Sequence, residues 1–97
     1  MKNVEEIKKT IEEHRSILEE RFKVKSIALF GSYLRSEQNE ESDIDILVDF
    51  YQIIDLFEFI ELEDFLSEIL GHKVDLVMKD TLKPRIKDRI LMEAVVI

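Results

Sequence analysis

The feature that most constrains the fold of this chain is an apolar run that begins with two carboxylates spaced two residues apart. Residues 43–50 read DIDILVDF. Alternate side chains of a β-strand point to opposite faces of a sheet, so the aliphatic residues 44, 46 and 48 share one face while Asp43 and Asp45 lie on the other. Two like charges this close are unfavourable without a counter-ion. The run therefore predicts a strand with a buried face, and a polar face that is either a cation site or the wet side of an edge strand.

The rest of the chain alternates between amphipathic segments and short apolar runs. We expect helices over residues 3–22, 55–70 and 81–94, strands over residues 25–32, 43–50 and 72–78, and a short final strand at residues 95–97. Capping boxes, Asn3 with Glu6 and Asp55 with Glu58, begin the first two helices, and Gly71 ends the second. This order predicts an α+β fold, a small mixed β-sheet with helices packed mainly on one face, and one domain over residues 1–97.

Three aromatic residues of the second helix, Phe57, Phe59 and Phe65, recur at mostly helical core spacing and are expected to pack. His14, near the apolar stripe of the first helix, is expected to be a packed or surface residue. Four basic residues of the last helix, from Lys83 to Arg89, either balance charge on a helix face or bind a phosphate or an acidic partner.

The charge of the chain argues against some classes of partner. Its net charge is −8, and the stretch from Glu37 to Glu68 contains no Lys or Arg. Nonspecific nucleic-acid binding needs a broad basic face, so nucleic acid is an unlikely partner. No apolar run approaches the ~20 residues that a membrane span requires, and the N-terminus is too charged for a signal peptide. With no cysteine in the chain, we expect a cytoplasmic protein without a membrane partner.

A third aspartate strengthens the cation interpretation. In HKVDLVM, Asp75 faces away from its aliphatic neighbours, and if this strand pairs beside residues 43–50, Asp75 completes a cluster of three carboxylates. Magnesium takes carboxylate and phosphate oxygens, and two ions about 4 Å apart could share such a cluster. Gly31 and Ser32 end the preceding strand. They are either an ordinary turn or a cradle in which the backbone and a hydroxyl approach phosphate oxygens.

The combined pattern resembles a known family. GSYLRSEQNEESDIDILVDF, followed by KVDLV and LKPRIKDRILMEAVVI, is similar to the minimal nucleotidyltransferases, the MNT or MntA-type antitoxins of the DNA polymerase β-like nucleotidyltransferase superfamily. The resemblance implies that Gly31 and Ser32 hold nucleotide phosphates and that Asp43 and Asp45 bind metal. It implies that Asp75 supports one metal ion and assists deprotonation of the attacking hydroxyl.

The loop after the Gly-Ser turn departs from the family in one position. The family often has Arg-Gly there; Arg35 matches, but Ser36 replaces the glycine. The resemblance makes Arg35 a candidate nucleotide-binding residue, and pairing of Arg35 with an acidic neighbour is the alternative.

The resemblance also implies an activity. This is Mg²⁺-dependent transfer of a nucleoside monophosphate, AMP from ATP, onto a hydroxyl of a partner protein, with two Mg²⁺ ions and release of pyrophosphate. The implied partner is a HEPN-domain toxin, modified on a tyrosine near its active site. The alternatives are a non-catalytic module that neutralises a toxin by masking it, and transfer to RNA or to a small molecule. A homo-oligomer is compatible with the sequence.

Overall fold

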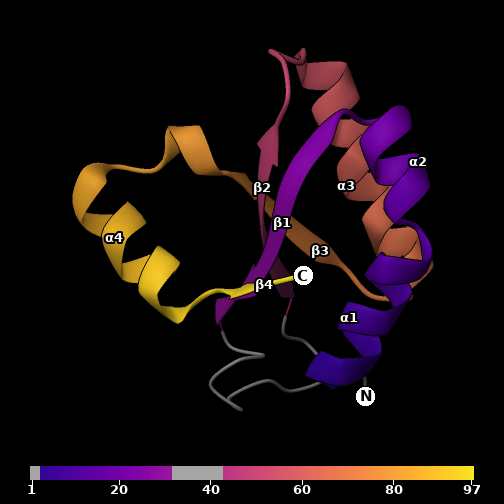
Figure 1. Ribbon diagram of the computed structural model, residues 1–97, viewed down its shortest axis with the longest axis horizontal. Coiled ribbons are helices and arrows are strands. Elements are labelled where there is room, and N and C mark those ends of the chain that lie inside the picture. Colours follow the sequence, from indigo (N-terminus) through magenta and orange to yellow (C-terminus); the bar gives the residue numbers. More distant parts are fainter. Residues whose placement is uncertain (1–2, 32–42) are drawn as a thin grey trace.

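A computed structural model of the chain describes residues 3–31 and 43–97, which are built around a mixed four-stranded sheet (Figure 1). The elements in chain order are α1 (Val4–Glu13), α2 (Arg15–Glu20), β1 (Val24–Phe30), β2 (Ile44–Phe50), α3 (Leu56–Leu70), β3 (Val74–Met78), a short 3₁₀ turn (Lys79–Thr81), α4 (Pro84–Glu93) and β4 (Val95–Val96). The strand order is β3-β2-β1-β4. Strand β2 runs antiparallel to β1 and parallel to β3, so the sheet is mixed as predicted.

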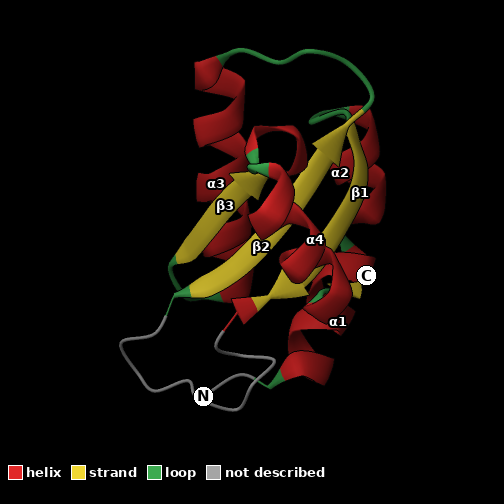
Figure 2. Cartoon of the chain, turned by 90° about the vertical axis from the view of Figure 1, so that its left-hand side faces the viewer, coloured by secondary structure: helices red, strands yellow, loops and turns green. Residues whose placement is uncertain are grey.

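The helices divide unequally between the two faces of the sheet. Helices α1, α2 and α3 cover one face and α4 crosses the other (Figures 1 and 2). The core lies under the three-helix face, and its fully buried side chains include Ile7 and Ile11 of α1, Ile44 and Ile46 of β2, and Leu62, Leu66 and Leu70 of α3. None of the side chains of α4 is buried. The predicted α+β fold with helices mainly on one face is confirmed.

The predicted N-caps of α1 and α3 are confirmed at the level of single hydrogen bonds. The Asn3 side chain accepts from the backbone N–H of Glu6 at 2.9 Å, and the Asp55 side chain accepts from that of Glu58 at 2.8 Å. Gly71 ends α3 in the left-handed region, with φ of 63°. Among the described helices, none is long and apolar enough to cross a membrane.

The prediction of one continuous helix over residues 3–22 is wrong, because the helix breaks at His14. In a continuous helix the backbone N–H of His14 would bond to the carbonyl of Thr10. Instead, the imidazole Nδ1 of His14 donates a hydrogen bond to the Thr10 carbonyl at 2.8 Å, and the backbone N–H of His14 donates to the carbonyl of Ile11 at 3.0 Å. The ring also packs edge-on against Phe65, with centroids 5.8 Å apart. His14 is thus a packed residue, and it separates α1 from α2.

The prediction that all three phenylalanines of α3 pack into the core is wrong for Phe57. Phe59 and Phe65 are half-buried against the core, but the side chain of Phe57 is 78% exposed. Four of the five residues 56–60 are apolar, so apolar side chains point in nearly every direction from the first turn of the helix. A helix that packs on a sheet buries only one stripe, so part of this turn must face outward.

The outer edge of the sheet at β3 is protected by side chains of α3. The Ser67 hydroxyl accepts from the backbone N–H of Val74, and the Glu63 carboxylate accepts from that of Leu76, both at 3.1 Å. An edge strand with free backbone donors is a template for unwanted pairing. These two hydrogen bonds satisfy the donors and fix α3 to the edge.

The other edge carries the C-terminus, which is held by residues far away in the sequence. Arg15 donates to the carbonyl of Ile97 at 2.6 Å, and the N–H of Ile97 bonds to the carbonyl of Ile27 at 2.9 Å. Arg15 also forms two hydrogen bonds with Glu12, and this contact lowers the pKa of Glu12 and raises the pKa of Arg15. The end of the chain, just after α4, is therefore tied to α2 and β1.

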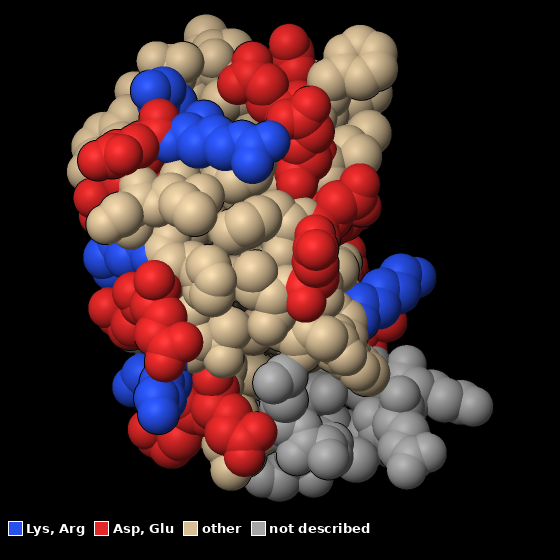
Figure 3. Space-filling view, turned by 90° about the vertical axis from the view of Figure 1, so that its right-hand side faces the viewer, with Lys and Arg blue, Asp and Glu red and all other residues tan. Residues whose placement is uncertain are grey.

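The helix-covered face is predominantly acidic. Figure 3 looks onto this face and shows many more acidic than basic side chains. Helix α3, which covers this face, has the exposed acidic residues Glu61, Asp64 and Glu68. The acidic stretch of the sequence therefore contributes to the surface of this face.

Candidate active site

Two of the three predicted metal-binding aspartates lie side by side on neighbouring strands. In the parallel pairing of β2 and β3, Asp45 is the partner of Asp75. The residues flanking each aspartate, among them Ile44, Ile46 and Leu76, are buried in the core, so both carboxylates project from the opposite face. Asp45 is half-buried and Asp75 is exposed. The condition stated from the sequence, that the third strand pairs beside residues 43–50, is thus met.

The two carboxylates lie in an open pocket between the sheet and α4. The pocket has a volume of about 640 Å³. It is lined from the sheet side by Phe30, Gly31, Asp45, Asp75 and Val77, and from the α4 side by Leu82, Arg89, Ile90 and Glu93. A cavity of this size falls in the range of small-molecule and cofactor sites. Its floor is acidic, and its opposite wall carries one cation and one carboxylate.

Gly31 permits the close approach of the backbone to Asp45. Its φ is +84°, a conformation that side chains other than glycine rarely adopt. A Cβ atom at this position would lie 2.9 Å from Cγ and 3.0 Å from Cβ of Asp45, and closer still to Oδ2. The backbone at Gly31 therefore lies so close to the Asp45 side chain that a residue with a Cβ atom would clash with it. Ser32, Arg35 and Ser36, the other predicted residues of this turn, lie outside the described residues.

Asp43 lies just before β2 and does not line the pocket. It shares the strand parity of Asp45, and its carboxylate lies 3.8 Å from the ammonium of Lys73. Within residues 3–31 and 43–97, no three His, Cys, Asp or Glu side chains lie close enough to hold a metal ion together. The convergence of Asp43 with Asp45 and Asp75 therefore stays a prediction.

The pair formed by Asp45 and Asp75 nevertheless fits a hard divalent cation. Both residues offer carboxylate oxygens, the donors that Mg²⁺ takes most readily. They face the same side of adjacent strands and open onto a pocket, and a cation between them would offset the repulsion of two like charges.

Arg89 is a residue of this site that the sequence left undecided. It lines the pocket opposite the two aspartates, and it makes no hydrogen bond or ion pair with any residue that the structure describes. Glu93 is four residues further along α4, and residues with this spacing share a helix face. That spacing is visible in the sequence. The sequence does not show which face of α4 meets the sheet, because the helix has no buried stripe to identify that face.

Comparisons with known proteins agree with this geometry. The family model described as Nucleotidyltransferase domain matches residues 11–97, a range that includes every residue lining the pocket. The protein adenylyltransferase MntA of Thermococcus cleftensis is 50% identical over 95 residues, which are 98% of this chain and 96% of that protein. The solved structure of a provisionally assigned minimal nucleotidyltransferase matches with a TM-score of 0.82 and 32% identity, covering 97% of this chain and 95% of the other. A solved toxin–antitoxin structure with AMP-PNP matches with a TM-score of 0.73 and 29% identity, covering 93% of this chain and 70% of the other.

Proposed function

Because this chain belongs to the nucleotidyltransferase domain family, we propose that it transfers AMP from ATP onto a hydroxyl of a partner protein. The observation that carries the proposal is the pairing of Asp45 with Asp75 at the floor of a pocket closed on one side by Gly31. The 50% identical relative named a protein adenylyltransferase supports AMP as the transferred group and a protein as the acceptor. The AMP-PNP present in the matching toxin–antitoxin structure supports an adenosine nucleotide.

The carboxylates are proposed to hold two Mg²⁺ ions. Asp45 and Asp75 already lie side by side on β2 and β3, and Asp43 has the same strand parity as Asp45. The 3.8 Å contact of Asp43 with Lys73 is largely exposed, so little free energy opposes its exchange for a metal contact. When bound, the ions polarise the α-phosphate and stabilise the leaving pyrophosphate.

The remaining steps are assigned to side chains and backbone of the chain. Gly31, just after β1, holds the phosphates together with Ser32 and Arg35, and Arg89 reaches them from the α4 wall. The acceptor hydroxyl oxygen forms a bond to the α-phosphorus, and the bond from that phosphorus to the bridging oxygen breaks, so pyrophosphate leaves. Asp75, the most exposed of the three carboxylates, takes the hydroxyl proton.

The proposed acceptor is a HEPN-domain toxin, which makes this chain the antitoxin of the pair. The pocket is open, and within the described residues a single exposed helix faces the two aspartates. A partner that covers this opening would complete the acceptor side of the site. We also propose that residues 1–97 act as a single domain and that the reaction takes place in the cytoplasm.

The experiment is to purify the chain with its HEPN-domain partner, add Mg²⁺ and ATP, and measure the intact mass of the partner. The expected result is an added mass of one or a few AMP groups, and release of pyrophosphate. Asp45→Asn and Asp75→Asn are expected to abolish the added mass, because each removes an anionic oxygen donor from the pocket floor.

Asp49→Asn is the matched control for these variants. Asp49 lies on the same strand with the same parity as Asp45, but it lines a different cavity at the other end of β2. Its variant should therefore keep the activity. Retained AMP transfer by Asp45→Asn would refute the proposal. A complex that suppresses toxicity without any added mass would instead favour neutralisation by masking.

A further inference from the structure

A cluster of exposed apolar side chains lies where β2 leads into α3, and none of them lines the pocket. The exposed fractions are 98% for Ile53, 69% for Leu56, 78% for Phe57 and 43% for Ile60. We call these four residues the α3 apolar surface. Scattered exposed apolar residues are ordinary, but a contiguous patch of a few hundred Å² usually marks an interaction site.

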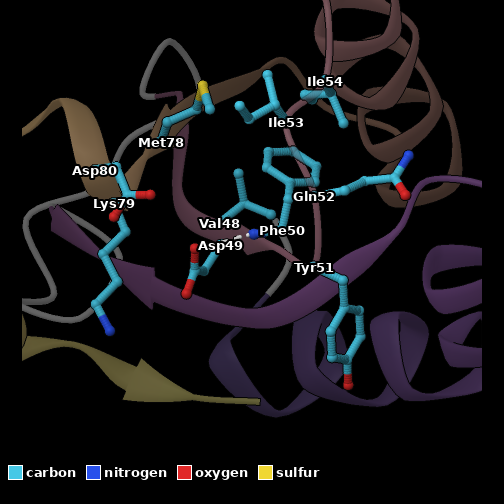
Figure 4. A pocket seen from close by; sticks show the side chains of 10 residues that line it. All are labelled: Val48, Asp49, Phe50, Tyr51, Gln52, Ile53, Ile54, Met78, Lys79 and Asp80. Atoms are coloured by element: carbon cyan, nitrogen blue, oxygen red, sulfur yellow. Dashed lines mark hydrogen bonds between the residues drawn. The ribbon is translucent and has the colours of Figure 1, made fainter.

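A hollow beside this cluster gives it a shape that a partner could fill. An apolar cavity of about 470 Å³ is lined by residues that include Leu56, Phe59, Leu76 and Met78. A second cavity of about 300 Å³ adjoins it and is lined by Ile53, Ile54 and Met78, among others. Figure 4 shows Ile53, Ile54 and Met78 on one side of the chain and Tyr51 pointing to the other. Protruding side chains beside apolar hollows are typical of the central contacts of protein interfaces.

Acidic residues of α3 border the α3 apolar surface, while Lys79 and Asp80 line the smaller cavity beside it. Asp55 caps the helix, and Glu58, Glu61 and Asp64 follow on its exposed turns. The chain as a whole has a net charge of −8. A second copy of the chain would therefore bring acidic rim against acidic rim, and an anionic membrane would repel it.

We propose that the α3 apolar surface is the docking site for the acceptor protein of the proposed reaction, through an apolar patch on that protein bordered by Lys and Arg. This inference rests on the proposed function, because that function supplies the partner. β2 ends at Phe50, roughly 17 Å along the strand from Asp45 at a rise of about 3.3 Å per residue, and the surface begins beyond that end. Docking there holds the partner without occupying the pocket, so binding and chemistry can be measured separately.

The test uses the HEPN-domain partner and the double variant Ile53→Ser with Phe57→Ser. Both side chains are largely exposed, so the fold should be kept; an unchanged melting temperature, with and without Mg²⁺ and ATP, checks this. The expected result is a Kd for the partner at least tenfold weaker than that of the unsubstituted chain. The association rate of the unsubstituted chain should fall as salt is raised, because the acidic rim steers a basic partner.

Met92→Ser is the matched control, since Met92 is 88% exposed on α4, outside the α3 apolar surface. It should leave the Kd unchanged. An unchanged Kd in the double variant, or an equal weakening by Met92→Ser, would overturn the assignment, as would failure of the unsubstituted chain to bind the partner. A dimer of the chain alone that the double variant dissociates in sedimentation experiments would identify a second copy as the occupant and also overturn it.

The failure of the proposed reaction would look different. In that case the partner would bind, the double variant would weaken binding, and the intact mass of the bound partner would show no AMP. Docking would then stand as the basis of masking, while AMP transfer would be rejected.

Discussion

Gly31→Ala tests whether the turn after β1 is shaped around the Asp45 carboxylate. The chain contains two glycines, and both have positive φ, +84° at Gly31 and +63° at Gly71. An added Cβ at Gly31 would lie 2.9 Å from Cγ of Asp45, whereas one at Gly71 would meet nothing within 4 Å. The two alanine variants therefore share the backbone strain and differ in the steric clash.

The size of the effect follows from these two terms. Left-handed backbone costs an L-residue about 1–2 kcal/mol, and a small gain from the stiffer unfolded chain offsets part of it in both variants. Overpacking against the Asp45 side chain adds about 1–3 kcal/mol, at Gly31 alone. Since 1 kcal/mol shifts the melting temperature of a domain of this size by roughly 4–8 °C, Gly31→Ala should melt on the order of 10 °C below Gly71→Ala.

The assay is thermal and urea unfolding of both variants, together with AMP transfer. Gly31→Ala should lose transfer because the Asp45 carboxylate must move, and Gly71→Ala should keep it. Asp45→Ala removes Cγ and Oδ2, so in the double variant Gly31→Ala should cost less than it does alone. Equal destabilisation by Gly31→Ala and Gly71→Ala, or no coupling with Asp45→Ala, would refute the reasoning.

Three further predictions concern the α4 wall and the residues that hold it. Arg89→Gln should raise the KM for ATP about tenfold or more, which steady-state kinetics measures, and Arg89→Lys should rescue it in part. The melting temperature should stay unchanged, because the Arg89 side chain is exposed and pairs with no described residue. Arg15→Met should speed amide hydrogen exchange of the C-terminal strand by removing the 2.6 Å hydrogen bond to Ile97, without unfolding the core. Finally, the hydrogen bond from Arg15 lowers the pKa of Glu12 below 4.5. The Glu12–Arg15 contact therefore stabilises the fold above about pH 4.5, and this stabilisation is lost as pH falls through the lowered pKa. The loss of stability in an acid titration should be small, because Glu12 is exposed.

The elements of the fold could be predicted where local chemistry determines them. The caps at Asn3 and Asp55 and the left-handed Gly71 depend on residues within one helical turn, so the sequence predicts them directly. Strand parity likewise predicts that Asp45 and Asp75 leave the buried face. Whether the two strands are neighbours depends on the long-range register, which the sequence could state only as a condition.

The failures have physical causes of two kinds. His14 breaks the first helix because its imidazole competes for a backbone carbonyl, and periodicity does not register such a side-chain hydrogen bond. The first turn of α3 is apolar on nearly every side, so more than one row of apolar side chains has the helical spacing of a core face. The sequence therefore predicts that Phe57 packs, although the structure leaves it exposed. Only the packing of Leu62 and Leu66 shows which stripe faces inward.

Arg89 shows why the α4 wall lies beyond sequence reasoning. Helix α4 buries no side chain, so its position over the pocket is not set by an apolar stripe. It is set by its ends: the 3₁₀ turn that follows β3, and the two-residue strand β4 on β1. The latter is reinforced by Ile97, which bonds to Ile27 and to Arg15. Within the described residues, few other contacts pack α4 against the sheet. The position of Arg89 opposite Asp45 and Asp75 therefore depends on these two connections.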